Sequence, residues 1–489
     1  MKNQVQIIAY VDRLTGGGIH DLSTLLNGPL VGVFGGIHLL PFFYPIDGSD
    51  AGFDPIDHTS VDPRLGTWDD LRTLGSSVEL MADLIVNHVS SLSPQFQNFS
   101  QFGSSSEYAG MFLTYDQVFP NGATEADLLR IYRPRPGLPF AYIALATGEK
   151  RLLWTTFTPQ QIDIDVLHPE GKAYLSAILE QFHAAGIRAV RLDAAGYAIK
   201  RAGSSCFMIP EAFNFIADLT AQAHALGIEV LVEVHSYYKQ QVEIARQVDW
   251  VYDFALPPLV LQALYKGDAE PLAKWLAVRP QNAITVLDTH DGIGVIDVGA
   301  GAASDLGLLE PAAIHDLIET IHKRSDGQSR RATGTAANNL DLYQVNCTYY
   351  DALGRNDAEY LIARAIQFFV PGIPQVYYVG LLAGTNDMEL LTRTGVGRDI
   401  NRHYYSLQEV EAALKKPFVK RLIELIRLRN MHPAFDGETN IESTAASTLA
   451  ISWRLGSQWA ALKVDFAKPS AVIEYSGKDA DSSNRICIG

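Results

Sequence analysis

Cysteine is scarce in this sequence. The 489 residues include only three, Cys206, Cys347 and Cys487, and none of them forms a Cys-x-x-Cys pair. An odd number of widely spaced cysteines excludes a disulfide scaffold and gives no support for a cysteine-rich metal site. We therefore expect free thiols in a reducing compartment.

Long hydrophobic runs are also lacking. No window approaches the roughly 18 consecutive apolar residues that a membrane span requires. The first residues, MKNQVQIIAYVDRL, contain neither an apolar run of signal-peptide length nor a small-residue cleavage site. We therefore expect a cytoplasmic protein with no membrane partner.

Positive charge is in deficit, with 39 Lys and Arg residues against 55 Asp and Glu residues and a formal net charge of −16. A field of this sign repels phosphate backbones, which argues against nucleic acid as a partner. It does not exclude an anionic substrate, because a local arginine pocket can offset the global field.

Apolar residues, in contrast, make up 47% of the chain, enough for a large core. They gather in eight short runs, at residues 4–11, 35–43, 78–88, 186–194, 227–235, 250–257, 282–291 and 371–380. The runs are nearly continuous, which is typical of strands that are covered on both faces. Helical patterns over 169–186 and 210–227 lie between runs, and each begins with Pro and ends with Gly.

Eight strands that alternate with helices predict an α/β fold, a closed (β/α)8 barrel. The alternative is an open doubly wound sheet, but no GxGxxG follows the first strand, so its dinucleotide-binding version has no support. We assign 1–87, 168–291 and 356–434 to the barrel. Residues 88–167 form an inserted B domain after the third strand, 292–355 a second excursion (B′) after the seventh, and 435–489 a small antiparallel β domain.

Four of the predicted strands end in charged or polar residues. These are Asp83, Asn87 and His88 on the third, Arg191 and Asp193 on the fourth, Glu233 and His235 on the fifth, and Asp288, His290 and Asp291 on the seventh. A single aspartate at a strand end is more often a helix cap or an ion-pair partner, and a single histidine is more often a packing residue. The joint pattern favours an active site, because the carboxyl ends of barrel strands share one mouth.

Four of these segments, DLIVNH, GIRAVRLDAA, EVLVEVH and VLDTHDG, resemble the signature motifs of the α-amylase superfamily, glycoside hydrolase family thirteen. Residues 52–71 resemble that family's loop after the second strand. The resemblance implies that Asp193 is the nucleophile, Glu233 the general acid/base and Asp291 the transition-state stabiliser. It also implies that the glucosyl ring or the carboxylates are contacted by His88, Arg191 and His290.

The chemistry of a retaining glycosidase agrees with this division of roles. It requires two carboxyl groups about 5–5.5 Å apart, one ionised and one protonated. Arg191 lies on the same face of its strand as Asp193, so we expect it to hold Asp193 ionised. The apolar context VLVEVH favours the neutral acid form of Glu233.

Four further stretches, at 47–58, 131–140, 336–357 and 397–405, resemble the phosphorylases of this family that cleave sucrose. The resemblance implies transfer of a glucosyl group from sucrose to inorganic phosphate, which yields α-glucose 1-phosphate and fructose through a covalent intermediate on Asp193, without a cofactor. The implied substrate-binding residues are Asp50, Phe53, His88, Arg135, Phe157, Arg191, Tyr197, His235, His290, Asp341, Leu342, Tyr343, Gln344 and Arg398.

Each group of these residues has an implied place in the site. Phosphate would be bound by Arg135 and Tyr343, and the fructosyl side would be formed by Asp341 and Gln344 with Tyr197 and His235 nearby. The glucose hydroxyls would be bound by Asp50 and Arg398, and the apolar side of the pocket would be lined by Phe53 and Phe157.

Other readings stay open at this point. The acceptor could be glycerol, glycerate or fructose 6-phosphate, and the reaction could be that of a retaining α-glucosidase or transglucosidase. A non-catalytic carbohydrate-binding protein is a third class, although retention of all three carboxylates argues against it. The resemblance also implies that a homodimer is one candidate assembly. Family members often bind calcium near the residue that matches Asn87, but we expect Asn87 to have a structural role and no metal to be bound.

Overall fold

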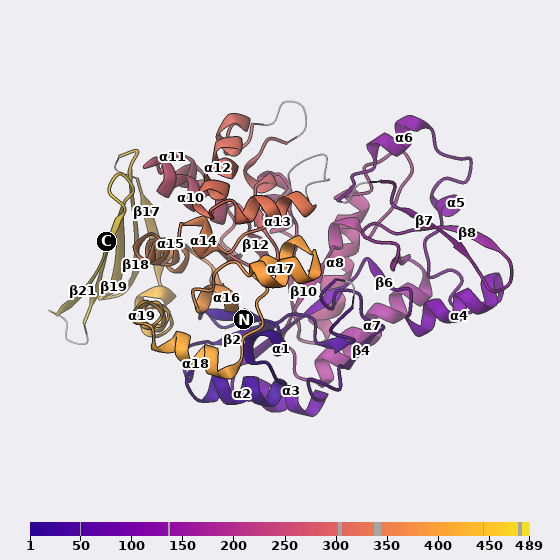
Figure 1. Cartoon of the computed structure of the whole chain (residues 1–489), viewed down its shortest axis with the longest axis horizontal. Helices are drawn as coiled ribbons and strands as arrows, with labels where there is room; N and C mark the ends of the chain where they lie inside the picture. Colours follow the sequence, from indigo (N-terminus) through magenta and orange to yellow (C-terminus); the bar gives the residue numbers. More distant parts are fainter. Residues whose placement is uncertain (49, 135–136, 302–305, 337–343, 444, 478–481) are drawn as a thin grey trace.

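Eight parallel strands close into a barrel at the centre of the molecule (Figure 1). The computed structural model describes residues 1–489 except 49, 135–136, 302–305, 337–343, 444 and 478–481. The barrel strands are β1 (Gln6–Ala9), β2 (Gly36–Leu39), β5 (Glu79–Ile85), β10 (Ala189–Asp193), β11 (Glu229–Val232), β12 (Trp250–Asp253), β13 (Ala283–Thr285) and β16 (Ile373–Tyr377). Each neighbours the next in this order, and β16 pairs with β1. The prediction of a closed barrel is confirmed, and the open-sheet alternative is wrong.

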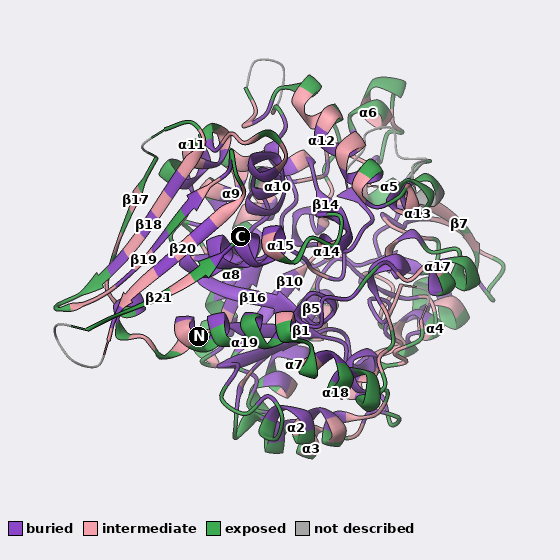
Figure 2. Cartoon of the chain, turned by 60° about the vertical axis from the view of Figure 1, so that its left-hand side comes forward, coloured by how far each residue is buried: buried purple, intermediate pink, exposed green. Residues whose placement is uncertain are grey.

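Helices cover the outside of the barrel. They include α2 (Ile19–Asn27), α3 (Trp68–Gly75), α7 (Pro169–Ala184), α8 (Pro210–Ala225), α10 (Leu256–Lys266), α11 (Glu270–Val278), α15 (Asp357–Phe369) and α19 (Pro417–Met431). Helices α7 and α8 begin at the predicted prolines, and the glycine beyond each has a positive φ, +79° at Gly186 and +69° at Gly227. The strands are buried on both faces, whereas α2 and α3 expose their outer faces (Figure 2). This burial explains the continuous apolar runs.

The barrel interior also contains a buried polar network. His38 on β2 contacts Asp83 on β5 with Nε2 and Oδ2 3.2 Å apart, and Asp83 accepts a hydrogen bond from Arg191 on β10. On the other side, the Tyr252 hydroxyl lies 3.3 Å from His38 Nδ1 and donates to Gln375 at 3.3 Å. The barrel interior is therefore crossed by a chain of hydrogen bonds that reaches Arg191 on β10.

The segment after β5 forms a separate lobe, on the right in Figure 1. It contains β6 (His88–Ser90), α4 (Pro94–Phe102), α5 (Tyr115–Val118), α6 (Glu125–Arg130), β7 (Phe140–Ala144), β8 (Lys150–Trp154) and β9 (Gln161–Asp163). A small hydrophobic cluster of its own includes Phe119 and Trp154 together with Cys206 from the segment after β10. The exact limits of the B domain stay a prediction.

The second excursion brings α12 (Pro311–Arg324), α13 (Gln328–Ala336) and two short strands to the barrel mouth. Strand β14 (Ile293–Gly294) pairs antiparallel with β15 (Gln344–Val345), so Gln344 lies opposite Gly294. This pairing places β15, near the end of the second excursion, beside the segment that follows Asp291.

The end of the chain forms an antiparallel sheet of β17 (Glu438–Glu442), β18 (Thr448–Leu455), β19 (Gln458–Asp465), β20 (Ser470–Ser476) and β21 (Ser483–Ile488), on the left in Figure 1. The predicted antiparallel β domain in this part of the chain is confirmed. Within the described residues, none of the helices is long and apolar enough to cross a membrane.

Candidate active site

The three predicted carboxylates lie at the same end of the barrel. Asp193 is the last residue of β10, Glu233 directly follows β11, and Asp291 lies in the segment between β13 and β14. Because the strands are parallel, their carboxyl ends form one mouth, which is where barrel enzymes carry their chemistry.

Arg191 connects two of these carboxylates to the barrel interior. Its NH1 lies 3.0 Å from Asp193 Oδ1, and its NH2 lies 2.8 Å from Glu233 Oε1. NH1 also donates to the fully buried Asp83. One guanidinium therefore serves three carboxylates, so Asp193 and Glu233 share their cation with Asp83.

The expectation that Arg191 holds the pKa of Asp193 down is wrong. Burial raises the pKa of Asp193; Arg191 acts against this, but Glu233 and Asp83 add to it, and the net pKa is well above the usual range. The sequence placed Arg191 correctly beside Asp193. It did not reveal that the same cation is shared with two other carboxylates.

Asp291 lies in the opposite environment. Its Oδ1 is 2.8 Å from Arg398 NH1 and 3.8 Å from Arg402 NH2. Burial alone would raise the pKa of Asp291, but Arg398, His290 and Arg402 lower it far below the usual range. Asp291 is therefore a permanent anion at the mouth.

The side of the mouth formed by the loop after β2 and the lobe after β5 combines aromatic and polar side chains. The Phe53 ring stacks on His290 at 4.9 Å, with the Arg191 guanidinium 5.6 Å from its centroid. His88 Nε2 lies 3.0 Å from the Phe53 carbonyl. Gln161 on β9 bridges His88, at 3.0 Å, and Asp50, at 3.4 Å.

Aromatic rings form the adjacent wall. The Phe157 ring lies 5.4 Å from His88 and 5.2 Å from Tyr197, in edge-to-face contacts. Facing them, His235 stacks on Phe254 at 3.8 Å and lies with Nε2 3.4 Å from Gln344 Nε2. Stacked rings with a few directed polar groups are typical of sites that bind a sugar ring.

The pocket at this mouth unites most of the predicted residues. Its lining consists of Asp50, Phe53, His88, Pro134, Phe157, Asp193, Ala194, Tyr197, Glu233, His290, Asp291 and Arg398. Arg191 lies beneath it, and His235 and Gln344 contact its edge through Glu233 and Arg398. Arg135, Asp341, Leu342 and Tyr343 lie outside the described residues.

The strand pattern also placed Asp288 at the mouth, but its side chain forms an ion pair instead. Asp288 accepts two hydrogen bonds from Arg364 NH2, at 2.8 and 2.7 Å, and is a buried ion-pair partner. Conversely, Gln161 could not be found from a local pattern, because its partners His88 and Asp50 lie 73 and 111 residues away.

Asn87 has structural contacts. Its side-chain amide donates to Asp163 Oδ1 at 3.1 Å, and its carbonyl oxygen accepts from Lys200 Nζ at 2.8 Å. Lys200 Nζ also lies 2.8 Å from Asp163 Oδ2, with both side chains buried. An ammonium group therefore supplies the positive charge at this end of β5.

A cation could in principle be held by Glu233, His235 and Asp291, whose ligand atoms lie within 4.8 Å of one another. However, Arg191 already pairs with Glu233 and Arg398 with Asp291. A metal ion there would meet two guanidinium groups, so we assign none.

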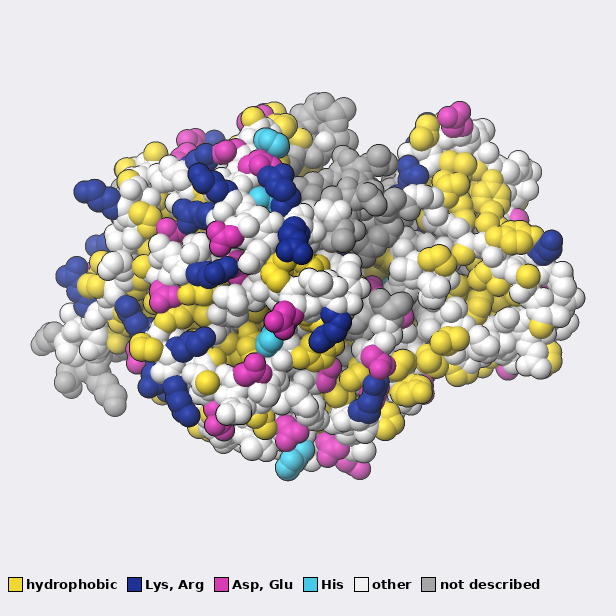
Figure 3. Space-filling model, in the orientation of Figure 1, with side chains coloured by type: hydrophobic (Ala, Val, Ile, Leu, Met, Phe, Trp, Pro, Cys, Tyr) yellow, Lys and Arg dark blue, Asp and Glu magenta, His cyan; other side chains and the backbone are white. Residues whose placement is uncertain are grey.

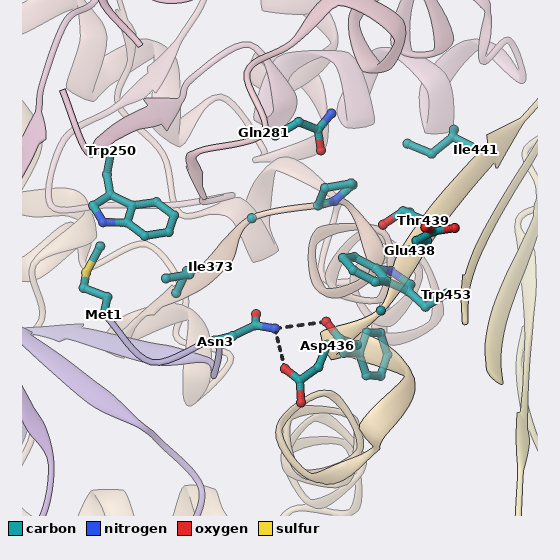
Figure 4. Close-up of a pocket in the computed structure, with 14 residues that line it drawn as sticks. Met1, Asn3, Trp250, Gln281, Ile373, Asp436, Glu438, Thr439, Ile441 and Trp453 are labelled. Carbon is teal, nitrogen blue, oxygen red and sulfur yellow. Dashed lines mark hydrogen bonds between the residues drawn. The ribbon is translucent and has the colours of Figure 1, made fainter. Parts of the chain in front are cut away.

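Two further features lie outside this pocket: the distribution of side chains on the surface and a second cavity. On the face in Figure 3, Lys and Arg side chains are interspersed with Asp and Glu over the barrel, and hydrophobic side chains form patches on the lobe after β5. A second cavity, of about 720 Å³, lies at the amino ends of the strands, between Trp250, Ile373 and Trp453 (Figure 4). There Asn3 donates to Asp436 and to the Phe435 carbonyl, which attaches the chain start to the C-terminal region. It lies at the end opposite the carboxylates.

Comparison with known proteins agrees with this geometry. Residues 31–403 match the catalytic domain of the α-amylases. The chain is 64% identical to a sucrose phosphorylase of Agrobacterium vitis over 98% of both chains, and 53% identical to one of Bifidobacterium adolescentis over 98% of this chain and 97% of that one. The crystal structure of a sucrose 6F-phosphate phosphorylase from Thermoanaerobacter thermosaccharolyticum is 38% identical, with a TM-score of 0.91 over 100% of this chain and 98% of that one. The chain therefore belongs to the α-amylase family, in the group that contains these phosphorylases.

Proposed function

We propose that this chain is an enzyme that transfers a glucosyl group reversibly from sucrose to inorganic phosphate, with α-glucose 1-phosphate and fructose as products. The observation that carries the proposal is the convergence of Asp193 and Glu233 on one guanidinium, with Asp291 held as an anion beside them. Full-length identity of 64% to a sucrose phosphorylase supports the choice of substrates.

In the first step, an Asp193 oxygen attacks the anomeric carbon of the glucosyl group. The bond from that carbon to the fructosyl oxygen breaks, and Glu233 donates its proton to the departing oxygen. Contact with the same arginine supports the short carboxyl separation, about 5–5.5 Å, of a retaining pair. The anion of Asp291 lies where positive charge develops on the sugar.

In the second step, a phosphate oxygen attacks the anomeric carbon from the face that fructose left. The ester bond to Asp193 breaks, and its electron pair returns to the carboxylate. Glu233, now a carboxylate, accepts the proton of the attacking oxygen when it carries one. Two inversions give net retention, so the product is the α anomer.

Substrate binding is divided along the pocket. We assign the glucose hydroxyls to Asp50 and Arg398 and the apolar face of the ring to Phe53 and Phe157, which line the pocket together. His88, Arg191 and His290 surround the glucosyl ring in the same proposal. The acceptor side takes Tyr197, His235 and Gln344, together with Arg135, Asp341, Leu342 and Tyr343 outside the described residues.

A cytoplasmic location and a homodimer belong to the same proposal. All three cysteines are free thiols, and two of them are buried, which suits a reducing compartment. The homodimer rests on the likeness to the phosphorylases alone.

The acceptor is the part of the proposal that most needs a test. Incubation with glucose 1-phosphate and, in turn, fructose, glycerol, glycerate or fructose 6-phosphate should release phosphate fastest with fructose. Faster release with any other acceptor would assign a related phosphorylase activity instead. A hydrolase would release phosphate and glucose at one rate whichever acceptor is present.

A further inference from the structure

A buried carboxylate that the proposed mechanism does not use lies directly behind His235. Asp297 belongs to the short 3-10 helix η3 (Ile296–Val298), six residues after Asp291, and is fully buried. Its Oδ2 lies 3.0 Å from His235 Nδ1. Among the described residues, Asp297 reaches the acceptor side of the pocket through the histidine.

The other contacts of Asp297 are all with hydrogen-bond donors. Its Oδ1 accepts from the Ser236 backbone N–H at 3.2 Å and from Gln241 Nε2 at 2.7 Å. Among the described residues, no Lys or Arg forms an ion pair with Asp297. The imidazole of His235 is therefore the group that can balance this buried charge.

The contact with Asp297 also fixes where the other nitrogen of His235 lies. With Nδ1 toward Asp297 and the ring stacked on Phe254, Nε2 faces the pocket, 3.9 Å from Glu233 Oε1. The side-chain nitrogen of Gln344 lies 3.4 Å from the same Nε2. In this geometry His235 Nε2 can accept from Gln344 Nε2. When His235 is protonated, its Nε2–H becomes a donor beside Glu233, from which an anionic oxygen could accept.

We propose that Asp297 is a positioning residue that keeps His235 as an imidazolium, with its Nε2–H directed at the acceptor side, and thereby favours phosphate over water as acceptor. The inference rests on the proposed function. In the second step the phosphate anion approaches Glu233 after Glu233 has lost its proton, and two like charges meet. The positive charge of His235 offsets that repulsion, whereas a water molecule needs no such help.

The electrostatics of the pocket are consistent with this role. Burial lowers the pKa of His235, but the charge of Asp297 and its hydrogen bond act against this effect, and the net pKa lies above its usual range. Glu233 and Asp291, which face His235 from β11 and from the segment after β13, act in the same direction. Gln344 and Phe254 contribute no charge.

The replacement Asp297→Asn separates charge from shape. The amide oxygen can still accept from Ser236 and Gln241, and the amide N–H then faces Nδ1, so the imidazole is neutral but keeps its Nε2–H. We expect kcat/KM for phosphate to fall about tenfold or more, because hydrogen bonds to charged groups are stronger than neutral ones. Release of glucose from sucrose without phosphate should change less than about twofold.

Gln241→Met is the matched control. It removes one hydrogen bond to the same carboxylate oxygen but keeps the charge, so the ratio of phosphorolysis to hydrolysis should match that of the wild type. If Asp297→Asn lowers both rates in proportion, or if Gln241→Met reproduces its selective loss, Asp297 is only structural and the inference fails.

His235→Gln keeps the inference testable if Asp297→Asn folds poorly, because it should lower kcat/KM for phosphate by a similar factor. Where Asp297→Asn folds, adding it to His235→Gln should lower kcat/KM for phosphate no further, because Asp297 acts through His235. Additive losses would overturn the inference. Wild-type enzyme that makes no glucose 1-phosphate from sucrose and phosphate would overturn the proposed function as well, whereas an active wild type with an unchanged ratio in the variants would overturn this inference alone.

Discussion

At the scale of single residues, the central fact is that Arg191 is shared. It contacts Asp83, Asp193 and Glu233 at once, so Asp193 lies in a buried site with insufficient positive charge. Such a group is costly to ionise in the folded protein. Asp193, the nucleophile of the proposed reaction, therefore lowers the stability of the folded protein when it is ionised for catalysis.

Asp193→Asn should reveal this conflict. The raised pKa of Asp193 means that the folded state binds its proton more tightly than the unfolded state, so stability falls as pH rises from the ordinary aspartate pKa through the raised value. At neutral pH the neutral asparagine should raise the free energy of unfolding by about 1 kcal/mol or more and lower kcat by about a thousandfold or more. Urea unfolding and glucose 1-phosphate formation measure the two effects. A variant that is less stable than the wild type would contradict this account of the site.

The same pKa shift predicts the acid side of the pH profile. Asp193 must be ionised to attack, so kcat/KM for sucrose should fall as pH falls through a value above 3.8, the ordinary value for aspartate. Initial rates from pH 3 to 8, with folding checked at each pH by circular dichroism, would measure it. An acid limb at or below 3.8 would show that Arg191 holds Asp193 ionised, as the sequence alone suggested.

Whether a site residue could be predicted depends on how far its partners lie from it along the chain. Asp193, Glu233 and Asp291 follow predicted strands, so strand periodicity and barrel geometry place them together. Gln161 and Asp297 belong to inserted segments, and nothing in the local pattern says which way these segments fold back. The shared role of Arg191 depends on the register of three strands, which the sequence does not specify.

At the scale of elements, the eight barrel strands were predictable because each is buried on both faces and reads as a continuous apolar run. The inserted segments were predictable only as insertions. Their strands are short, and β7 and β8 are partly exposed. One of the contacts that join the lobe after β5 to the barrel is polar. Lys200, after β10, reaches Asp163 on β9 and Asn87 at the end of β5.

Lys200→Met should weaken that junction. It leaves the buried Asp163 carboxylate without its cation, which costs about 3–5 kcal/mol of stability. The double variant Lys200→Met, Asp163→Asn should recover part of the loss, since no unpaired charge remains. Lys274→Met, at an exposed ion pair on α11, is the control and should leave the melting temperature unchanged. Equal effects of Lys200→Met and Lys274→Met in thermal melts would refute a structural role for the buried pair.

At the scale of the whole molecule, the C-terminal sheet packs against the barrel far from the carboxylates. Trp453 on β18 donates from Nε1 to the Phe369 carbonyl at 2.7 Å and packs on Phe435, 5.7 Å between centroids. The alternating pattern of the tail predicted its strands. It did not predict this docking, which depends on a hydrogen bond between residues 84 positions apart.

Trp453→Ala should therefore separate stability from activity. Loss of a large buried ring costs about 3–5 kcal/mol in the free energy of unfolding. Glucose 1-phosphate formation at a temperature where the variant is folded should match the wild type. Trp459→Ala, at a half-buried position on β19, is the control and should cost less in urea unfolding. An activity loss in the folded Trp453 variant would show that the sheet influences the distant pocket.

Phosphorus NMR of the wild-type enzyme with sucrose and phosphate would follow the proposed transfer itself. We expect α-glucose 1-phosphate to accumulate at a rate that rises with phosphate and then saturates, with fructose formed in equal amount. Accumulation of the β anomer would contradict retention through Asp193. Release of glucose at the same rate with and without phosphate would contradict a phosphorylase.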